Sequence, residues 1–175
     1  MKKKSNIYYA KEIIKREIGS LNRTLKRIDS SFDKACKILS NVSGKVVTIG
    51  LGKSGYIAMK MSGTLSSTGT PSTFIHATEA LHGDIGSIKR NDVVIIYSNS
   101  GETNEILKLL PLLKLLKCSI ISITGNTASS LAKYSDITLD ASVTREACPN
   151  NLAPSSSIVC ALAISDALAL TVATQ

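Results

Sequence analysis

The sequence is poor in aromatic residues and in cysteine. Seven aromatic residues among 175 speak against a protein that stacks bases along a single nucleic-acid strand. The four cysteines lie far apart and form no C-x-x-C pair, which is typical of free thiols in a reducing compartment. We expect Cys36, Cys118 and Cys160 to be buried without a disulfide, and Cys148 to pack near the functional site.

Long apolar runs are missing as well. The most apolar run covers residues 158–173 and includes Asp166, which is short for a membrane span and typical of a buried helix. The first residues contain no apolar segment of the kind found in signal peptides. We therefore expect a cytoplasmic protein that has no membrane partner.

The positive charge is concentrated at one end of the chain. Residues 1–44 contain 11 Lys and Arg against 4 Asp and Glu, whereas residues 45–175 contain 10 and 9. A nucleic-acid-binding protein would more often spread basic residues over a docking face, so no nucleic-acid partner is expected. The length fits one domain with its own hydrophobic core.

Two amphipathic helices are predicted in residues 1–44, where apolar residues recur at steps of three, four or seven. Gly19 interrupts this pattern, so the first helix is expected to end there, and residues 41–44 should end the second. The apolar stripe of the second helix needs a cover, either along the sheet edge or against a second subunit. Its members are Leu21, Leu25, Ile28, Phe32 and Leu39.

From residue 45 onward, short apolar runs alternate with helical segments. This alternation predicts an α/β fold, a three-layer αβα sandwich with a five-stranded parallel sheet covered by helices on both faces. Residues 45–175 would form this unit, and residues 1–44 would add the N-terminal helices of one domain. Ligands in such sheets bind beyond the carboxyl ends of the strands. We expect strands at 46–49, 73–76, 93–97, 119–123 and 137–139, and helices at 54–67, 102–117, 128–134 and 155–172.

Two segments at these strand ends have the composition of anion-binding turns. Gly50–Gly55 matches G-x-G-x-x-G between a strand and a helix, where backbone N–H groups can meet a phosphate; a tight turn without a ligand is the alternative. Dinucleotide binding would need an acidic residue after the next strand, where Ile75 and His76 stand. Ser98–Thr103 offers three hydroxyls at a helix start, more than capping requires, which favours an anion site. Ser155–Ser157 repeats the pattern more weakly.

The candidate acid–base groups are few. Both histidines, His76 and His82, follow the second predicted strand, and carboxylates number nine among residues 45–175. Among these, Glu105 lies beside the hydroxyl-rich segment and Glu146 follows the last predicted strand. An enolisation needs a base near neutral pH and a partner for the developing oxyanion, which such groups could supply. Spacing alone does not choose among them, and a solvated helix start explains each glutamate equally well.

Together these motifs resemble the sugar-isomerase (SIS) domain of D-arabinose 5-phosphate isomerases. The similarity runs from about Val46 to Ala169, and the blocks His82-Gly83-Asp84 and Glu146–Pro149 are specific to this isomerase group. The resemblance implies interconversion of D-ribulose 5-phosphate and D-arabinose 5-phosphate through an enediol. That product feeds synthesis of 3-deoxy-D-manno-octulosonate, a sugar of lipopolysaccharide and of some capsules.

The resemblance also implies roles for individual residues. Catalytic groups of the family fall on Lys53, Glu105, Glu146 and His82. No cofactor is implied, although a histidine of an inhibitory zinc site falls on His76. The implied assembly is a homotetramer with sites near subunit boundaries. Substrate- and phosphate-binding positions fall on Gly52, Ser54, Gly69, Thr70, Ser98, Asn99, Ser100 and Thr103.

Two departures from the family pattern leave alternatives open. Many members continue into a pair of CBS domains, and they carry a His-Pro-Gly-Gly segment just beyond the last SIS helix; neither follows here. A truncated chain, a homologue that works without that histidine and an impaired enzyme would each explain this. A non-catalytic sugar-phosphate-binding SIS protein, or an isomerase of another ketose phosphate, is therefore the alternative to the pentose phosphate isomerase.

Overall fold

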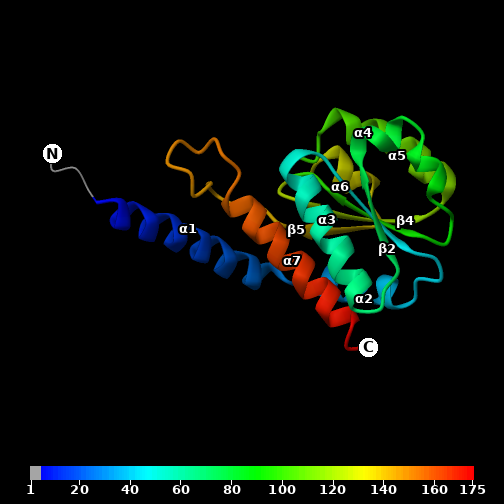
Figure 1. The fold of residues 1–175 in the computed structure, drawn as a ribbon, viewed down its shortest axis with the longest axis horizontal. Helices are drawn as coiled ribbons and strands as arrows, with labels where there is room; N and C mark the ends of the chain where they lie inside the picture. The colour runs from blue at the N-terminus through cyan, green and yellow to red at the C-terminus, as the bar shows by residue number, and fades with distance from the viewer. Residues whose placement is uncertain (1–4) are drawn as a thin grey trace.

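Five strands rich in valine, isoleucine and threonine form one parallel sheet in the computed structural model, which describes residues 5–175 (Figure 1). Their order across the sheet is β2-β1-β3-β4-β5. All four pairings are parallel, so the carboxyl ends of the strands share one edge. The strands are β1 (Val46–Gly50), β2 (Ser72–His76), β3 (Val93–Tyr97), β4 (Ser119–Thr124) and β5 (Ile137–Asp140).

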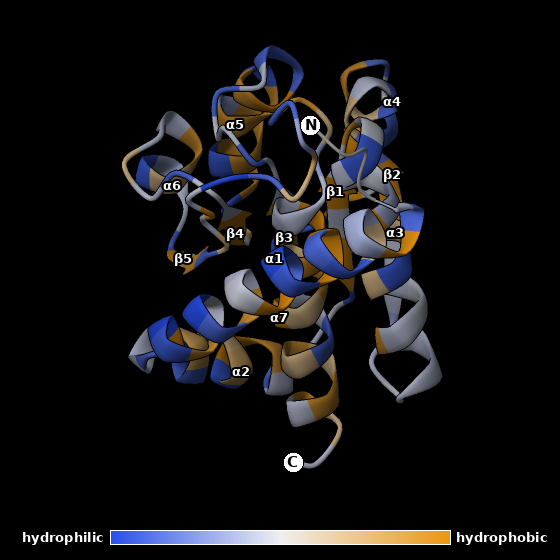
Figure 2. Cartoon of the chain, turned by 90° about the vertical axis from the view of Figure 1, so that its left-hand side faces the viewer, coloured by the Kyte–Doolittle hydropathy of each residue, from blue (hydrophilic) through white to orange (hydrophobic). Residues whose placement is uncertain are grey.

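Helices cover both faces of this sheet, as the sequence predicts. On one face lie α3 (Gly52–Ser67) and α7 (Ser156–Val172), and on the other lie α4 (Ala77–Leu81), α5 (Asn104–Leu116) and α6 (Ser130–Tyr134). Successive residues of each strand enter opposite cores, because strand side chains alternate between faces. Figure 2 shows the apolar strands enclosed by helices whose outer surfaces are more polar.

The two N-terminal helices divide at a different residue from the one predicted. α1 runs through Asn6–Arg27 and contains Gly19, whereas α2 covers Ser30–Ser40. A glycine inside a helix costs about 1 kcal/mol, which does not stop a helix of this length. The break instead falls at Asp29, whose side chain accepts a hydrogen bond from the Ser31 N–H at 2.8 Å and caps α2.

The apolar stripe of these helices is only partly covered. Leu39 is buried, and Phe32 packs against the core beneath α2 and α7. Leu25 remains 72% exposed on α1, the helix that projects from the sheet in Figure 1. Ile14 and Ile18 on the same helix are also exposed. The chain itself thus covers the α2 end of the stripe and leaves the α1 end in solvent.

The segment between β2 and β3 contains structure that the sequence did not predict. α4 follows β2 directly, and a short 3-10 helix, η1, spans Asp84–Ser87. Elsewhere the predicted helices and strands agree with the structure to within about two residues, the scatter expected at element ends. Pro111 lies inside α5 without ending it. None of the helices in residues 5–175 is both long enough and apolar enough to cross a membrane.

Candidate active site

A small cavity opens at the carboxyl edge of the sheet, where β1, β3, β4 and β5 end and α3 and α7 begin. Its polar lining includes Ser54, Ser98, Asn99 and Ser157, and apolar residues such as Ile57 close its base. The structure therefore brings three predicted phosphate-binding residues, Ser54, Ser98 and Asn99, to one place. This is the edge at which parallel α/β sheets bind ligands.

The Ser98–Thr103 segment joins β3 to α5 in a tight turn. Ser98 Oγ lies 2.8 Å from Thr103 Oγ1 and accepts a hydrogen bond from the Gly101 N–H at 3.1 Å. Gly101 has a positive φ of 66°, and the Ser129 side chain occupies the space that a Cβ would need. Glycine is required here on both counts.

The first turn of α5 keeps its hydrogen-bond donors available. Within residues 5–175 no acceptor lies within hydrogen-bond distance of the N–H groups of Asn104, Glu105 and Ile106. The side chain of Thr103, the N-cap residue, makes no capping bond to them. Unpaired donors at a helix start, together with the helix dipole, favour a bound anion.

The Gly50–Gly55 segment combines a packing requirement with exposed donors. A Cβ on Gly50 would lie 2.7 Å from the Ser54 carbonyl oxygen, so close approach of the turn accounts for this glycine without a ligand. It does not account for Lys53, which is exposed at the start of α3. The ammonium group is therefore free to meet an anion at the same edge of the sheet.

Glu146 has a structural role that the sequence did not reveal. Its carboxylate accepts hydrogen bonds from the N–H groups of Ser155 and Ser157, at 2.8 and 3.2 Å, and from both their hydroxyls, at 3.2 and 2.5 Å. Glu146 thus caps the start of α7. Burial raises the pKa of this carboxyl, but the hydrogen bonds from Ser157 and Ser155 outweigh burial and hold the pKa below its ordinary value. An ionised group held in this way is a weak base.

The remaining acid–base candidates are dispersed along the same edge. Glu105 is half-buried in the first turn of α5, and His82 is exposed at the end of α4. His76 ends β2 and meets the Phe74 ring edge-on, at a centroid distance of 6.5 Å. Among residues 5–175 no three His, Cys, Asp or Glu side chains gather as metal ligands. His76 in a single chain therefore does not fit a zinc site.

Gly69 and Thr70 lie at the opposite end of the sheet. They follow the last turn of α3 and precede β2, and they line a surface cavity together with residues from the ends of α2 and α7. Because α3 runs back along the parallel strands, these two residues are separated from Ser98 by the length of the sheet. One chain cannot bring them to the carboxyl-edge cavity.

Two further side chains at this edge were not among the predicted site residues. Ser157 lines the cavity and also donates to Glu146, and the run Ser155–Ser157 was its only signal in the sequence. Glu102 accepts a hydrogen bond from the Ser130 N–H at 2.7 Å and so caps α6 rather than its own helix. Only the folded chain brings Glu102 and Ser130 together.

The cysteines follow the prediction in three cases of four. Cys36, Cys118 and Cys160 are buried, and all four thiols are free. Cys148 was expected to be a packing residue, but it is partly exposed in the loop after β5. Its backbone N–H lies 3.3 Å from Ser155 Oγ, which places the thiol beside the Glu146 cap.

Comparison with known proteins agrees with this arrangement of strands and loops. The family model described as SIS domain matches residues 38–171. This chain belongs to the SIS domain family. The match includes the whole sheet and every predicted site residue, whereas α1 lies outside it.

Several SIS-containing proteins are similar over nearly the whole chain. Arabinose 5-phosphate isomerase KdsD of Pseudomonas aeruginosa is 50% identical over 94% of this chain and 50% of its own length. Arabinose 5-phosphate isomerase KpsF of Escherichia coli is 46% identical over 94% and 52%. A solved SIS structure from E. coli CFT073, in complex with arabinose 5-phosphate, is 43% identical with a TM-score of 0.94, over 98% of this chain and 93% of that one. The chain spans about half the length of the curated relatives that it matches.

Proposed function

We propose that this SIS domain interconverts D-ribulose 5-phosphate and D-arabinose 5-phosphate. The observation that carries the proposal is the similarity, over almost the full length of both chains, to a structure solved with arabinose 5-phosphate. The names of the relatives point to the same aldose–ketose isomerisation. The product would enter synthesis of 3-deoxy-D-manno-octulosonate for lipopolysaccharide or capsule.

The phosphate of the substrate would bind where β3 meets α5. Support comes from the unpaired N–H groups at the start of α5 and from the hydroxyl-lined cavity beside them. Ser98, Asn99, Ser100 and Thr103 would surround the phosphate. Ser54 and the N–H of Gly52 would approach it from α3. A helix start of this kind favours a dianion over a neutral sugar.

The reaction moves a proton between two carbon atoms. A base takes a proton from C1 of ribulose 5-phosphate, an enediolate forms, and a proton returns to C2 to give the aldose. Lys53 would stabilise the negative oxygen of the enediolate. His82 is our choice for the base, because the Glu146 carboxylate is already engaged by four hydrogen bonds. Glu105 would assist proton transfer or orient Lys53, and Glu146 would act as a positioning residue.

The assembly is proposed to be a homotetramer that needs no cofactor. The apolar stripe left exposed on α1 supports contact with a second chain. So does the position of Gly69 and Thr70, which would reach a carboxyl-edge site only if it belongs to another chain. Zinc, if His76 takes part in binding it, would likewise need ligands from beyond one chain.

Incubation with ribulose 5-phosphate in deuterated water tests the proposal. We expect arabinose 5-phosphate carrying deuterium at C2, detected by proton NMR, with unchanged activity after treatment with a chelator. Binding of the pentose phosphate without turnover would instead support a sugar-phosphate-binding protein. Faster turnover of another ketose phosphate in a substrate panel would indicate a different isomerase.

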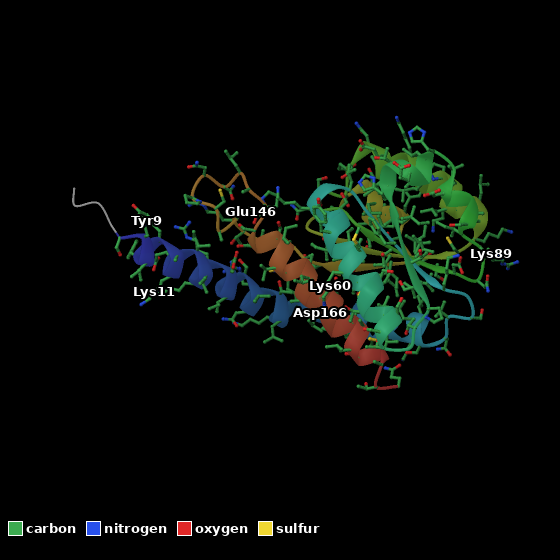
Figure 3. All side chains as sticks on the ribbon, in the orientation of Figure 1. Tyr9, Lys11, Lys60, Lys89, Glu146 and Asp166 are labelled. Carbon is green, nitrogen blue, oxygen red and sulfur yellow. The ribbon has the colours of Figure 1, made fainter. Side chains whose placement is uncertain are left out.

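A charge-matched pair of variants tests the role of Lys53. Lys53→Met should lower kcat about 100-fold or more, since it removes a cation at the developing oxyanion. Lys89→Met removes the same charge from an exposed position ahead of β3, remote from the carboxyl edge (Figure 3), and should keep full activity. Equal activity of both variants would exclude Lys53 from the chemistry.

A further inference from the structure

We propose that a basic cavity between α1 and the loop after β5 binds a phosphate group, at a site separate from the Ser98–Thr103 segment. The loop, residues 141–155, lies beside α1 in Figure 1. The cavity measures about 350 Å³, enough for a phosphate ion or a small phosphomonoester. Its walls include Lys15, Arg16, Arg23 and Arg145, with the hydroxyls of Ser20 and Thr144.

The three arginines of this cavity lack acidic partners. Within residues 5–175 none of them forms an ion pair. Each places one nitrogen on a neutral oxygen: Arg16 on the Ala147 carbonyl at 3.4 Å, Arg23 on Ser20 Oγ at 3.0 Å, and Arg145 on the Pro149 carbonyl at 2.8 Å. Their remaining N–H donors are available to a ligand. The planar guanidinium fork matches phosphate oxygens better than any other side chain.

The acidic residues of the cavity do not cancel this charge. Glu12 lies 3.2 Å from the Lys15 ammonium, and Glu146 turns its carboxylate toward Ser155 and Ser157. Four cationic side chains thus face two acids whose oxygens already have partners. A cleft with such an excess of positive charge attracts small anions.

The position of the cavity connects it to the Glu146 cap. Figure 3 shows Glu146 in the loop that passes over α1 on its way to α7. Arg16 holds the carbonyl of Ala147, the next residue, and Arg145 precedes Glu146 directly. An anion held by these arginines would bridge α1 to the loop. We expect bound phosphate to slow hydrogen exchange in residues 142–155.

The test is titration calorimetry with inorganic phosphate. The double variant Arg16→Gln, Arg23→Gln removes two guanidinium groups but keeps good helix formers in α1. It should weaken phosphate binding about 10-fold or more, because charged hydrogen bonds are the strong ones. The control Lys34→Gln, Lys37→Gln removes the same charge from α2, away from the cavity, and should bind phosphate like the wild type. Arg145→Gln, which leaves α1 untouched, should weaken binding several-fold.

The outcomes separate this site from the proposed catalytic one. In a Thr103→Asp chain, which blocks the start of α5, the arginine-dependent binding should persist. If that variant loses all phosphate binding while the arginine variants bind normally, the second site does not exist and the proposed function stands. Equal weakening in the lysine control would show a general charge effect and overturn the proposal.

A repeat titration in saturating ribulose 5-phosphate identifies the source of the phosphate. If the arginine-dependent phosphate binding persists, a free phosphate or another phosphomonoester occupies the cavity. If the sugar phosphate displaces phosphate from the cavity, the substrate's own phosphate binds there. Both results support a phosphate site at the arginines, and they separate its two ligand sources.

Discussion

The starts of α5 and α7 use the same physical feature in opposite ways. Both helices begin at the carboxyl edge of the sheet, where unpaired N–H groups favour a negative charge. At α7 the Glu146 carboxylate of the same chain supplies that charge. At α5 the first-turn N–H groups have no acceptor among residues 5–175. The open helix start is therefore the better phosphate site, and the closed one holds the loop after β5 in place.

Closing the open helix start should give the largest effect. Thr103→Asp places a carboxylate at the N-cap of α5, as Glu146 does at α7. Asp caps a helix well, so stability should be kept or rise by about 0.5 kcal/mol. A phosphate about 4 Å away would be repelled by a few kcal/mol, so kcat/KM should fall about 100-fold.

The matched control for this change is Thr103→Asn, which caps without a charge. It should keep activity within about fivefold of the wild type, since no like charge is introduced. Steady-state kinetics and thermal unfolding of the three proteins decide the matter. Equal losses in the Asn and Asp variants would mean that the threonine hydroxyl, and not the open helix start, binds the phosphate.

Opening the closed helix start should mainly cost stability. Glu146→Gln replaces an ionised acceptor of four hydrogen bonds with a neutral amide, and should lower the free energy of unfolding by about 1–3 kcal/mol. Ser157→Ala removes one of these bonds, and the double variant should lose less than the sum of the single ones. Urea unfolding measures all three. Additive losses would show that Glu146 and Ser157 do not act through each other.

The same cap predicts a dependence of stability on pH. The pKa of Glu146 is lower in the folded chain than its ordinary value, so the unfolded chain binds the proton more readily. The stabilisation is therefore complete above the unfolded pKa of about 4.3 and is lost as pH falls through the lower folded value. Urea unfolding between about pH 3 and 7 should show a smaller fall at the acid end in Glu146→Gln than in the wild type. Identical curves would contradict the cap.

The sequence predicts the sheet well because strand formation depends on local composition. Runs such as Val93–Tyr97 allow few other structures, and the turns after them were recognised from glycine and serine alone. The division between α1 and α2 was wrong, because a local glycine was weighed without the Asp29 cap. The resemblance named Glu146, but its bonds to Ser155 and Ser157 span 9 and 11 residues. Such partners follow from tertiary structure and not from spacing.

The smallest expected effect concerns the thiol beside the closed helix start. Nearby backbone N–H groups, first that of Ala153, lower the pKa of Cys148, whereas burial raises the pKa of Cys36 and of Cys118. Since the thiolate is the reactive form, Cys148 should be alkylated first in the native protein. Mass spectrometry after brief iodoacetamide treatment identifies the modified residue. Cys148→Ser should remove this fast reaction yet keep most of the activity, because the Glu146 cap does not use the sulfur; a loss of several orders of magnitude would instead make Cys148 part of the chemistry.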